Sequence, residues 1–259
     1  MNISFIIVNY KTKELVFQAI ESIQKFAKNF TYEIIVVDNN SEDGSSQYLK
    51  KNFSKIKLIA SPENVGFGKG NNLGIKEAEG DYIFFFNSDA YLIDESIERL
   101  FKRANNIPDL GAIAPLILNE DKTIQQSGGY FPTLLKVFFW MSFIDDLPGG
   151  TWLKPYHIDH DSFYGKEREL DWVTGAAFMV PKKVLEKVGT FDKEIFMYGE
   201  DVDLCHRIKK AGLKIIMNPE SKIVHIGQGS SGKISANAIL GEYQTILHVY
   251  KKNGLIVIS

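Results

Sequence analysis

The sequence predicts an α/β fold in which one Rossmann-like, mostly parallel central sheet is flanked by helices. Strand-like apolar runs and helix-like amphipathic runs alternate from residue 3 to about residue 115, which is typical of a parallel sheet with crossover helices. Residues 82–86 form a continuous run of aromatic and β-branched side chains, as expected for a strand buried on both faces. At 259 residues, the chain is long enough for one large domain, and we expect a single one over 1–259.

The first half of the chain contains the regular alternation. Helices are expected from Thr12 to about Phe26 and over 95–105, where apolar residues recur at helical spacing. Strands are expected at 3–8, 33–37, 57–60, 82–86 and 111–114, the last of them closed by Pro115.

The second half begins with an irregular region over 116–170. Order is expected to resume with a strand at 171–180, a short helix opened by Pro181, a helix that Gly212 ends, strands at 213–217 and 222–226, and a helix over 235–252. The apolar run 134–141 is expected either to be a helix packed on the core or to be a surface for a lipid-linked substrate or a membrane. The set His157, Asp159, His160 and Asp161 has no known ligand spacing, so we interpret it as a solvated loop.

Charge and cysteine content exclude several classes of protein. Thirty basic and 32 acidic residues give a formal charge of −2 without a like-charge block, so we expect no nucleic-acid partner. The single cysteine, Cys205, excludes an internal disulfide and a Cys-cluster zinc site. The first residues lack a secretory signal, and no run reaches the roughly 18–20 apolar residues of a membrane span. A cytoplasmic protein is therefore expected, and peripheral contact with the inner face of the membrane through 134–141 or the apolar 255–258 remains open.

Polar residues follow two of the predicted strands directly. Asp38 ends the second strand, and Asn87, Ser88 and Asp89 follow the fourth. Ligands of open α/β sheets bind beyond the carboxyl ends of the strands, so these side chains are candidates for a site. Asp38 could accept a hydrogen bond from a nucleobase N–H, and Asp89 is the first candidate for chemistry. The alternative is that both loops contain only turn and helix-cap residues.

A glycine-rich segment leads into the third helix. Gly66, Gly68 and Gly70 follow the third strand and do not have the spacing of a dinucleotide-binding fingerprint. They more plausibly permit a close backbone approach to a helix N-terminus, with Asn64 and Asn72 available for hydrogen bonds.

Two further features carry titratable groups. Glu200 and Asp201 open a predicted helix, where the helix dipole favours their charged forms, and only one of them can face a given substrate atom. His225 lies in a predicted strand before the glycine-rich segment 227–232. Alone, such a histidine is usually a core residue with its hydrogen bonds satisfied.

In order along the chain, these motifs resemble those of the inverting nucleotide-sugar glycosyltransferases of family 2, which have the GT-A fold. The resemblance covers residues 3 to about 250 and is strongest with the rhamnosyltransferase-like branch. It implies a nucleotide-binding half over 1–115 and an acceptor-binding half over 116–259. The implied reaction moves a sugar, rhamnose from dTDP-rhamnose or another sugar from a UDP donor, to a hydroxyl of a glycan or lipid-linked glycan in cell-surface polysaccharide synthesis.

The resemblance also implies roles for individual residues. Asp201 would be the general base, with Glu200 as the alternative, and Asp89 and His225 would hold Mn²⁺ or Mg²⁺. The pocket for the acceptor or sugar would include Trp172, Thr174 and Gly175. The nucleotide would be bound by Val8, Asn9, Tyr10, Asp38, Asn64, Gly66, Phe67, Asn72, Asn87 and Ser88.

Two departures from the family pattern and two other functions stay open. Asn87 stands where the family often has an aspartate, and Lys11 where relatives often have an asparagine. The first departure would also fit a non-catalytic nucleotide- or carbohydrate-binding module. A sugar-phosphate nucleotidyltransferase is disfavoured, because the segment 9–13 has no glycine for a triphosphate loop.

Overall fold

The computed structural model describes residues 1–131, 133, 136, 142, 156, 158, 161–227 and 236–252. Four of the expectations above fall outside these residues: the run 134–141 apart from Lys136, the residues His157, Asp159 and His160, most of the glycine-rich segment 227–232, and the apolar segment 255–258.

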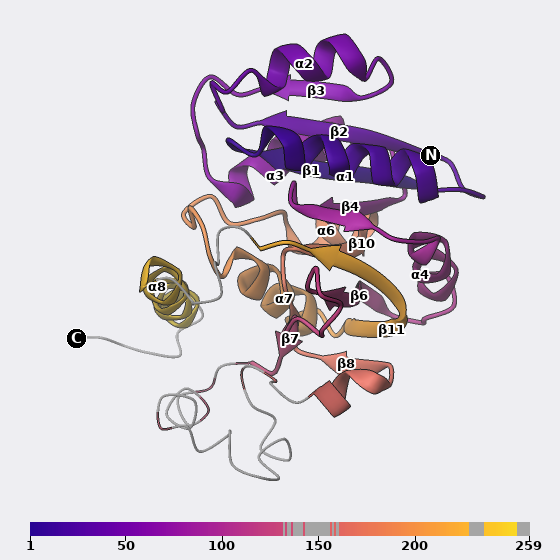
Figure 1. Cartoon of the computed structure of the whole chain (residues 1–259). Helices are drawn as coiled ribbons and strands as arrows, with labels where there is room; N and C mark the ends of the chain where they lie inside the picture. The colour runs from indigo at the N-terminus through magenta and orange to yellow at the C-terminus, as the bar shows by residue number, and fades with distance from the viewer. Residues whose placement is uncertain are drawn as a thin grey trace.

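A nine-stranded sheet forms the centre of the molecule (Figure 1). Its strand order is β3-β2-β1-β4-β10-β6-β11-β5, and β8 pairs with β11 beside this path. The strands of the first half are β1 (Ile3–Asn9), β2 (Tyr32–Asp38), β3 (Lys57–Ala60), β4 (Tyr82–Phe86) and β5 (Ala90–Leu92). The others are β6 (Leu110–Leu118), β8 (Arg168–Leu170), β10 (Ala177–Pro181) and β11 (Lys214–His225).

The first half of the sheet is parallel, as the alternating pattern predicts. β1 pairs in parallel with β2 and β4, and β2 pairs in parallel with β3. In this register Asn9 lies opposite Asp38, so the two polar side chains meet at one edge of the sheet. The second half is mixed, because β10 runs antiparallel between β4 and β6, whereas β11 is parallel to β6.

Helices cover both faces of the sheet. The helices are α1 (Lys13–Phe26), α2 (Ser45–Asn52), α3 (Phe67–Glu77), α4 (Ser96–Ala104), α6 (Lys182–Val188), α7 (Glu200–Lys210) and α8 (Ala236–Lys252). A short 3₁₀ helix, η2, spans Asp161–Gly165. The buried residues of α1 and α4 join one core cluster, and those of α6 and α7 join the other.

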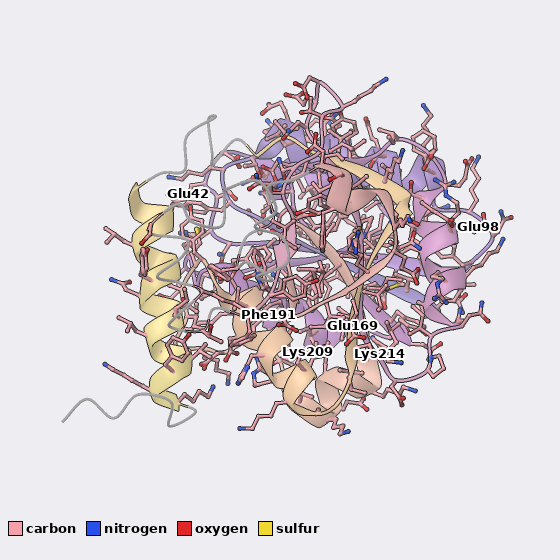
Figure 2. All side chains as sticks on the ribbon, turned by 90° about the horizontal axis from the view of Figure 1, so that it is seen from below. Glu42, Glu98, Glu169, Phe191, Lys209 and Lys214 are labelled. Carbon is pink, nitrogen blue, oxygen red and sulfur yellow. The ribbon has the colours of Figure 1, made fainter. Side chains whose placement is uncertain are left out.

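The side chains of β4 alternate between the two faces of the sheet, so both faces need to be covered by helices. Phe84 and Phe86 point into the cluster of α1 and α4, whereas Ile83 and Phe85 point into the cluster of α6 and α7. The prediction of a strand buried on both faces is confirmed, since each of these four side chains is at most 1% exposed. Seen from below, Phe191 lies in the interior while Glu98 projects outward from α4 (Figure 2).

Three predicted strand boundaries were wrong. Pro115 does not close its strand: β6 continues through it, because β11 bulges between Asn218 and Lys222, next to the point where Pro115 is paired, and a bulge tolerates the missing N–H. The same bulge joins the two strands expected at 213–217 and 222–226 into one strand, β11.

The third boundary error concerns the strand expected at 171–180. The structure divides it into β9 (Trp172–Val173), which pairs with β7 (Gly128–Gly129) in a separate sheet, and β10 in the main sheet. The break lies at Thr174–Gly175, where the chain turns towards α7. The Gly175 N–H donates to Asp201 instead of joining either sheet.

The last helix, α8, stands beside α7 (Figure 1). It contacts the rest of the molecule through the buried side chains Thr245, Ile246, Val249 and Tyr250. Within the part of the chain that the structure describes, no helix combines the length and the apolar character needed to cross a bilayer.

Candidate functional site

The carboxyl ends of β1 and β2 hold a buried polar cluster. Asn9 is fully buried, and its Nδ2 donates to Asp38 Oδ1 (3.1 Å) and Ser41 Oγ (2.9 Å). The second oxygen of Asp38 accepts from the Ser46 hydroxyl on α2. The structure therefore places Asp38 at the predicted edge of the sheet, 6% exposed and hydrogen-bonded through both oxygens.

A second set of contacts joins this cluster to the loop after β4. Thr12 donates to Asn9 Oδ1 (2.8 Å) and lies 2.7 Å from Ser88 Oγ. The predicted nucleotide residues at the ends of β1 and β4 are thus adjacent. Tyr10, beside them, is 42% exposed, and its ring lies below the Lys11 ammonium group at 5.2 Å from the centroid.

The glycine-rich loop is held by two asparagines. Asn39 Nδ2 donates to Asn64 Oδ1 (2.8 Å), and Asn39 Oδ1 accepts from the Val65 N–H (3.0 Å). Gly66 has φ +84°, and a Cβ on it would lie 2.3 Å from the carbonyl oxygen of Phe196. The close approach that the sequence predicts at this helix N-terminus is therefore made by the segment before α7, whose Phe196 carbonyl also accepts from the Phe67 N–H (3.0 Å).

Asn72, predicted to contact a nucleotide, is paired with the protein backbone. Its amide donates to the Phe191 carbonyl (2.8 Å) and accepts from the Phe191 N–H (3.0 Å). This pair joins α3 to the segment 189–199, which precedes α7. Its contact with a nucleotide stays a prediction.

The predicted metal residues lie in contact with each other. His225, at the end of β11, places Nε2 3.1 Å from Asp89 Oδ1 and 3.2 Å from Asn87 Nδ2. Its other nitrogen, Nδ1, lies 2.7 Å from Gln125 Oε1. The antiparallel pairing of His225 with Ala90 in β5 produces this arrangement, because it sets the end of β11 beside the loop after β4.

This group of side chains fits a divalent cation. Asp89 supplies a carboxylate and His225 an imidazole, a mixed set that suits Mn²⁺ and, less well, Mg²⁺. The Asn87 Oδ1 atom is buried, and it has no hydrogen-bond partner among the described residues. The Asn87 amide lies beside the Asp89–His225 pair with its nitrogen towards Nε2, and its unpartnered oxygen makes Asn87 a candidate third ligand.

Glu200 and Asp201 open α7, as predicted, after Tyr198 and Gly199, which both have positive φ. Both oxygens of Asp201 accept backbone N–H groups, from Gly175 at 2.6 Å and from Val202 at 2.8 Å. Asp201 is partly exposed. Its carboxylate is therefore fixed in position and remains accessible.

Glu200 has the opposite environment. It is 6% exposed, and its Oε2 is buried without a hydrogen-bond partner in the described part of the chain. Burial, with a further contribution from the neighbouring Asp201 charge, raises the pKa of Glu200 to about 8. Glu200 is thus largely protonated at neutral pH, a state in which it cannot accept a proton.

One cleft of about 670 Å³ is lined both by Asn87 and His225 and by the acidic pair. It is lined by Phe67, Asn87, Asn119, Ile124, Gln125, Gln126, Trp172, Thr174, Gly175, Ala176, Met197, Tyr198, Gly199, Glu200, Asp201, Val202 and His225. Of the predicted site residues, the structure brings Phe67, Asn87, Trp172, Thr174, Gly175, Glu200, Asp201 and His225 into this lining. Asp89 is not in the lining but contacts His225, and Asn9 and Asp38 belong to the buried cluster at the ends of β1 and β2. Asn64, which is partly exposed, lies in the loop after β3 and accepts from Asn39.

Sequence reasoning missed the hairpin 118–125, which supplies Asn119, Ile124 and Gln125 to the cleft. The segment carries turn residues but no periodic pattern, and nothing in it indicates that it returns to His225. The segment 196–199 was also missed as cleft lining, although its proximity to the acidic pair was a usable signal.

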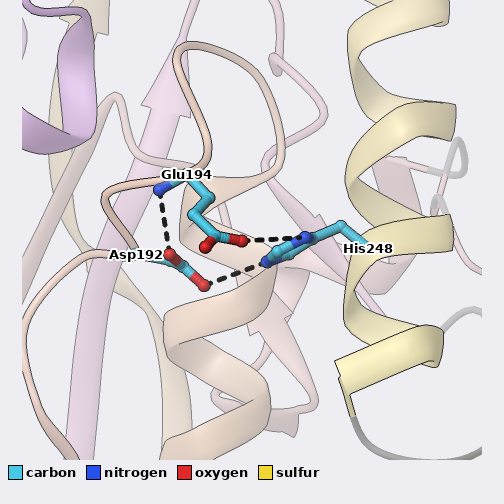
Figure 3. A group of neighbouring side chains, drawn as sticks. All are labelled: Asp192, Glu194 and His248. Carbon is cyan, nitrogen blue, oxygen red and sulfur yellow. Dashed lines mark hydrogen bonds and ion pairs between the residues drawn. The ribbon is translucent and has the colours of Figure 1, made fainter.

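A second acid–histidine cluster lies outside the cleft (Figure 3). Asp192, Glu194 and His248 each offer one ligand atom, and these atoms lie within 4.8 Å of one another. His248 reaches from α8 towards the segment 189–199, with Nε2 3.1 Å from Asp192 Oδ2. Lys252 Nζ contacts the same oxygen at 2.5 Å, so a side-chain cation already neutralises it. We interpret this cluster as a brace between α8 and the segment before α7.

The family model described as "Glycosyl transferase family 2" matches residues 4–188, which is more than half of the chain. This chain belongs to glycosyl transferase family 2. The match ends before α7, so the acidic pair is assigned by its position in the structure rather than by this model.

Two proteins similar to this family 2 glycosyltransferase are rhamnosyltransferases. An N-acetylglucosaminyl-diphospho-decaprenol L-rhamnosyltransferase of Mycobacterium tuberculosis is 27% identical over 223 residues, which cover 82% of this chain and 72% of that protein. Rhamnosyltransferase WbbL of Escherichia coli K12 is 26% identical over 228 residues, which cover 85% of this chain and 81% of the relative. The resemblance to rhamnosyltransferases is confirmed at this level.

The fold is shared with solved glycosyltransferases. A crystal structure of GalNAc-T7 with UDP, GalNAc and Mn²⁺ superposes with a TM-score of 0.71 at 14% identity. The superposition covers 97% of this chain and 48% of that longer protein. The expected GT-A fold is therefore confirmed.

Proposed function

We propose that this glycosyltransferase transfers a sugar, with inversion, from a nucleotide-diphosphate donor to a hydroxyl of a glycan or lipid-linked glycan acceptor in cell-surface polysaccharide synthesis. The observation that carries the proposal is the cleft, in which one space of about 670 Å³ is lined both by Asn87 and His225 and by Glu200 and Asp201. Transfer with inversion needs a group for the departing diphosphate and a base for the incoming hydroxyl, and these two sets of residues are proposed for the two roles.

In the proposed reaction, Asp201 accepts the proton of the acceptor hydroxyl. The hydroxyl oxygen then bonds to the anomeric carbon from the face opposite the diphosphate, while the bond between that carbon and the diphosphate oxygen breaks. The nucleoside diphosphate leaves with the bonding electron pair. The Gly175 and Val202 N–H groups orient the Asp201 carboxylate, and positioned bases of this kind contribute about 10²- to 10⁴-fold in rate.

Asp89, His225 and the Asn87 amide oxygen would hold Mn²⁺ or Mg²⁺. When bound, such a cation neutralises the charge that develops on the diphosphate oxygens. Backbone contacts fix the positions of two of these residues. The pairing of β5 with β11 fixes His225, and the backbone N–H of Asn87 donates to the Ala176 carbonyl (2.9 Å).

The donor is proposed to be dTDP-rhamnose: the names of the two similar rhamnosyltransferases support the sugar, and the name of a third relative, dTDP-rhamnosyl transferase RfbF of Shigella flexneri, supports the nucleotide. A UDP-sugar is the alternative within the same mechanism, and UDP is the nucleotide in the GalNAc-T7 structure. Asp38 at the edge of β2 is proposed to accept from the N–H of thymine or uracil. Peripheral membrane contact at the cytoplasmic face stays a prediction.

The direct test is Asp201→Asn. We expect transfer from dTDP-rhamnose to fall at least about 100-fold, because the amide cannot accept the proton. Donor affinity should stay near that of the wild type, measured by calorimetric titration with dTDP, UDP and GDP, each with and without Mn²⁺. Since the Asn side chain can accept from only one of the two N–H groups, thermal unfolding of the variant is recorded as well.

The matched control is Glu98→Gln, which also replaces a carboxylate by an amide but lies on α4, outside the cleft lining. It should transfer at the wild-type rate. Wild-type turnover by Asp201→Asn would remove Asp201 as the base. Absence of nucleotide binding in the wild type would favour the non-catalytic module instead.

A further inference from the structure

The hairpin after β6 brings a glutamine beside the end of β11. Asn119 and Thr123 close the hairpin, with the Asn119 N–H donating to the Thr123 carbonyl (2.9 Å), and Asp121 accepts from the Thr123 N–H (3.0 Å). The Gln125 N–H then donates back to the Ile117 carbonyl (2.9 Å). These bonds fix the backbone at Gln125, so its side chain meets His225 in one geometry.

The amide of Gln125 has one chemically consistent orientation. Its Nε2 lies 3.3 Å from the His225 carbonyl oxygen and 2.9 Å from Asn119 Oδ1. A backbone carbonyl can only accept a hydrogen bond, so the nitrogen end of the Gln125 amide must face it. The oxygen end, Oε1, consequently lies 2.7 Å from His225 Nδ1.

This orientation decides which imidazole nitrogen carries a hydrogen. Because Gln125 Oε1 can only accept, His225 Nδ1 must donate to it. In the neutral ring, Nε2 then has a lone pair, to which the Asn87 amide nitrogen can donate at 3.2 Å, while Asp89 Oδ1 lies 3.1 Å from the same Nε2 atom. Two electron-rich atoms at this distance repel each other unless a proton or a cation lies between them.

We propose that Gln125 is a positioning residue, which holds the His225 imidazole in the Nδ1–H form so that Nε2 and Asp89 together take a divalent cation. The inference rests on the proposed function, because it concerns the cation of the same cleft. It adds a residue that binds neither the nucleotide nor the cation and acts only through His225. Partners of metal-bound histidines that fix the ring in this way typically contribute 10- to 100-fold to metal affinity.

The test is the Mn²⁺ affinity of the whole chain in the presence of dTDP or UDP, measured from the electron paramagnetic resonance signal of free Mn²⁺. Gln125→Ala removes the acceptor at Nδ1 and should weaken Mn²⁺ binding about 10- to 100-fold. Gln125→Glu keeps an acceptor at Nδ1, so its affinity should return to within a few-fold of the wild-type value. The control Gln18→Ala changes an exposed glutamine on α1, outside the cleft lining, and should leave Mn²⁺ affinity unchanged.

Thermal unfolding of each variant separates a loss of fold from a loss of metal affinity. Equal weakening in Gln125→Ala and Gln125→Glu would overturn the inference, since it would assign the effect to hairpin packing rather than to the acceptor at Nδ1. Unchanged affinity in Gln125→Ala would overturn it as well. If His225→Ala loses Mn²⁺ binding while Gln125→Ala keeps it, the role of Gln125 is wrong and the proposed cation site stands. If the wild type binds no Mn²⁺, the cation of the proposed function fails with it.

Discussion

Two carboxylate–histidine pairs in this protein have the same spacing and different surroundings. His225, which lines the cleft, lies 3.1 Å from Asp89, and His248, near the C-terminal end of α8, lies 3.1 Å from Asp192. The side chains that flank His225 besides Asp89 are the neutral amides of Asn87 and Gln125. Asp192, in contrast, also contacts the ammonium group of Lys252 at 2.5 Å.

The difference shows that the neighbours of such a pair decide its role. At Asp192, burial would raise the pKa, but the Glu194 N–H, Lys252 and His248 hold the pKa of this carboxyl well below its usual range. A metal ion there would have to displace an ammonium group. At His225, the two flanking amides carry no charge, and the unpartnered Asn87 oxygen is a further group that a cation could use.

The largest expected effect is the loss of metal-dependent nucleotide binding when the carboxylate of the Asp89–His225 pair is removed. Asp89→Ala should abolish Mn²⁺-dependent nucleotide binding and lower transfer more than about 100-fold, because the charged ligand is removed. Asp192→Ala removes the corresponding carboxylate of the other pair and should leave Mn²⁺ affinity unchanged. Calorimetric titration with dTDP and Mn²⁺ measures both variants.

Asp192→Ala has its own expected cost. It removes the acceptor for the Glu194 N–H (3.0 Å) and the contact with α8, so we expect a loss of about 1–2 kcal/mol in the free energy of unfolding, measured with urea. A loss of Mn²⁺ binding in Asp192→Ala, with normal binding in Asp89→Ala, would reverse our assignment of the two pairs.

A third carboxyl group, that of Glu200, differs from Asp89 and Asp192 because its charged neighbour is another carboxylate, Asp201, and not a histidine. Its raised pKa of about 8 means that the folded protein binds a proton that the unfolded chain releases near pH 4.5. Stability from this proton is present below pH 4.5 and is lost as the pH rises to about 8, because the folded state holds more protons in that window.

Glu200→Gln should therefore flatten the pH dependence of stability between about pH 4.5 and 8. The wild type should lose a few kcal/mol relative to the variant over this window, since one pKa unit corresponds to about 1.4 kcal/mol. Urea unfolding at a series of pH values measures both proteins. Parallel curves for the two would show that Glu200 is ionised at neutral pH, and it would then again be a candidate base.

Much of the fold could be predicted because the strands of the first half are predominantly apolar. The apolar run 82–86 predicted a central strand, and the bounds of β1, β2 and β3 lie within a residue or two of the expected ranges. The boundaries that failed depend on distant partners. A sequence does not show that β11 bulges next to Pro115, or that the Gly175 N–H turns away from the sheet to reach Asp201.

The candidate site divides in the same way. Asp89, Asp201 and His225 were found from the order of the motifs at the ends of strands and helices. In the structure, Asp201 and His225 line one cleft, and Asp89 contacts His225. Gln125 could not be found, because its role depends on a hairpin that returns across 100 residues to His225. The Asp192–His248 pair could not be predicted for the same reason, because its members are 56 positions apart in the sequence.

The smallest expected effect tests whether Lys252 is what prevents Asp192, Glu194 and His248 from binding a metal. Lys252 is 46% exposed in its side chain, so Lys252→Ala should cost at most about 1 kcal/mol of stability. Without the ammonium group, the three remaining side chains offer two oxygens and an imidazole nitrogen, ligands that Zn²⁺ accepts. Measured in an Asp89→Ala background, which removes binding at the cleft, Zn²⁺ should raise the melting temperature after Lys252→Ala and not before it. His248→Ala added to this variant should abolish the shift, and an equal shift with Lys252 present would show that its charge does not exclude the metal.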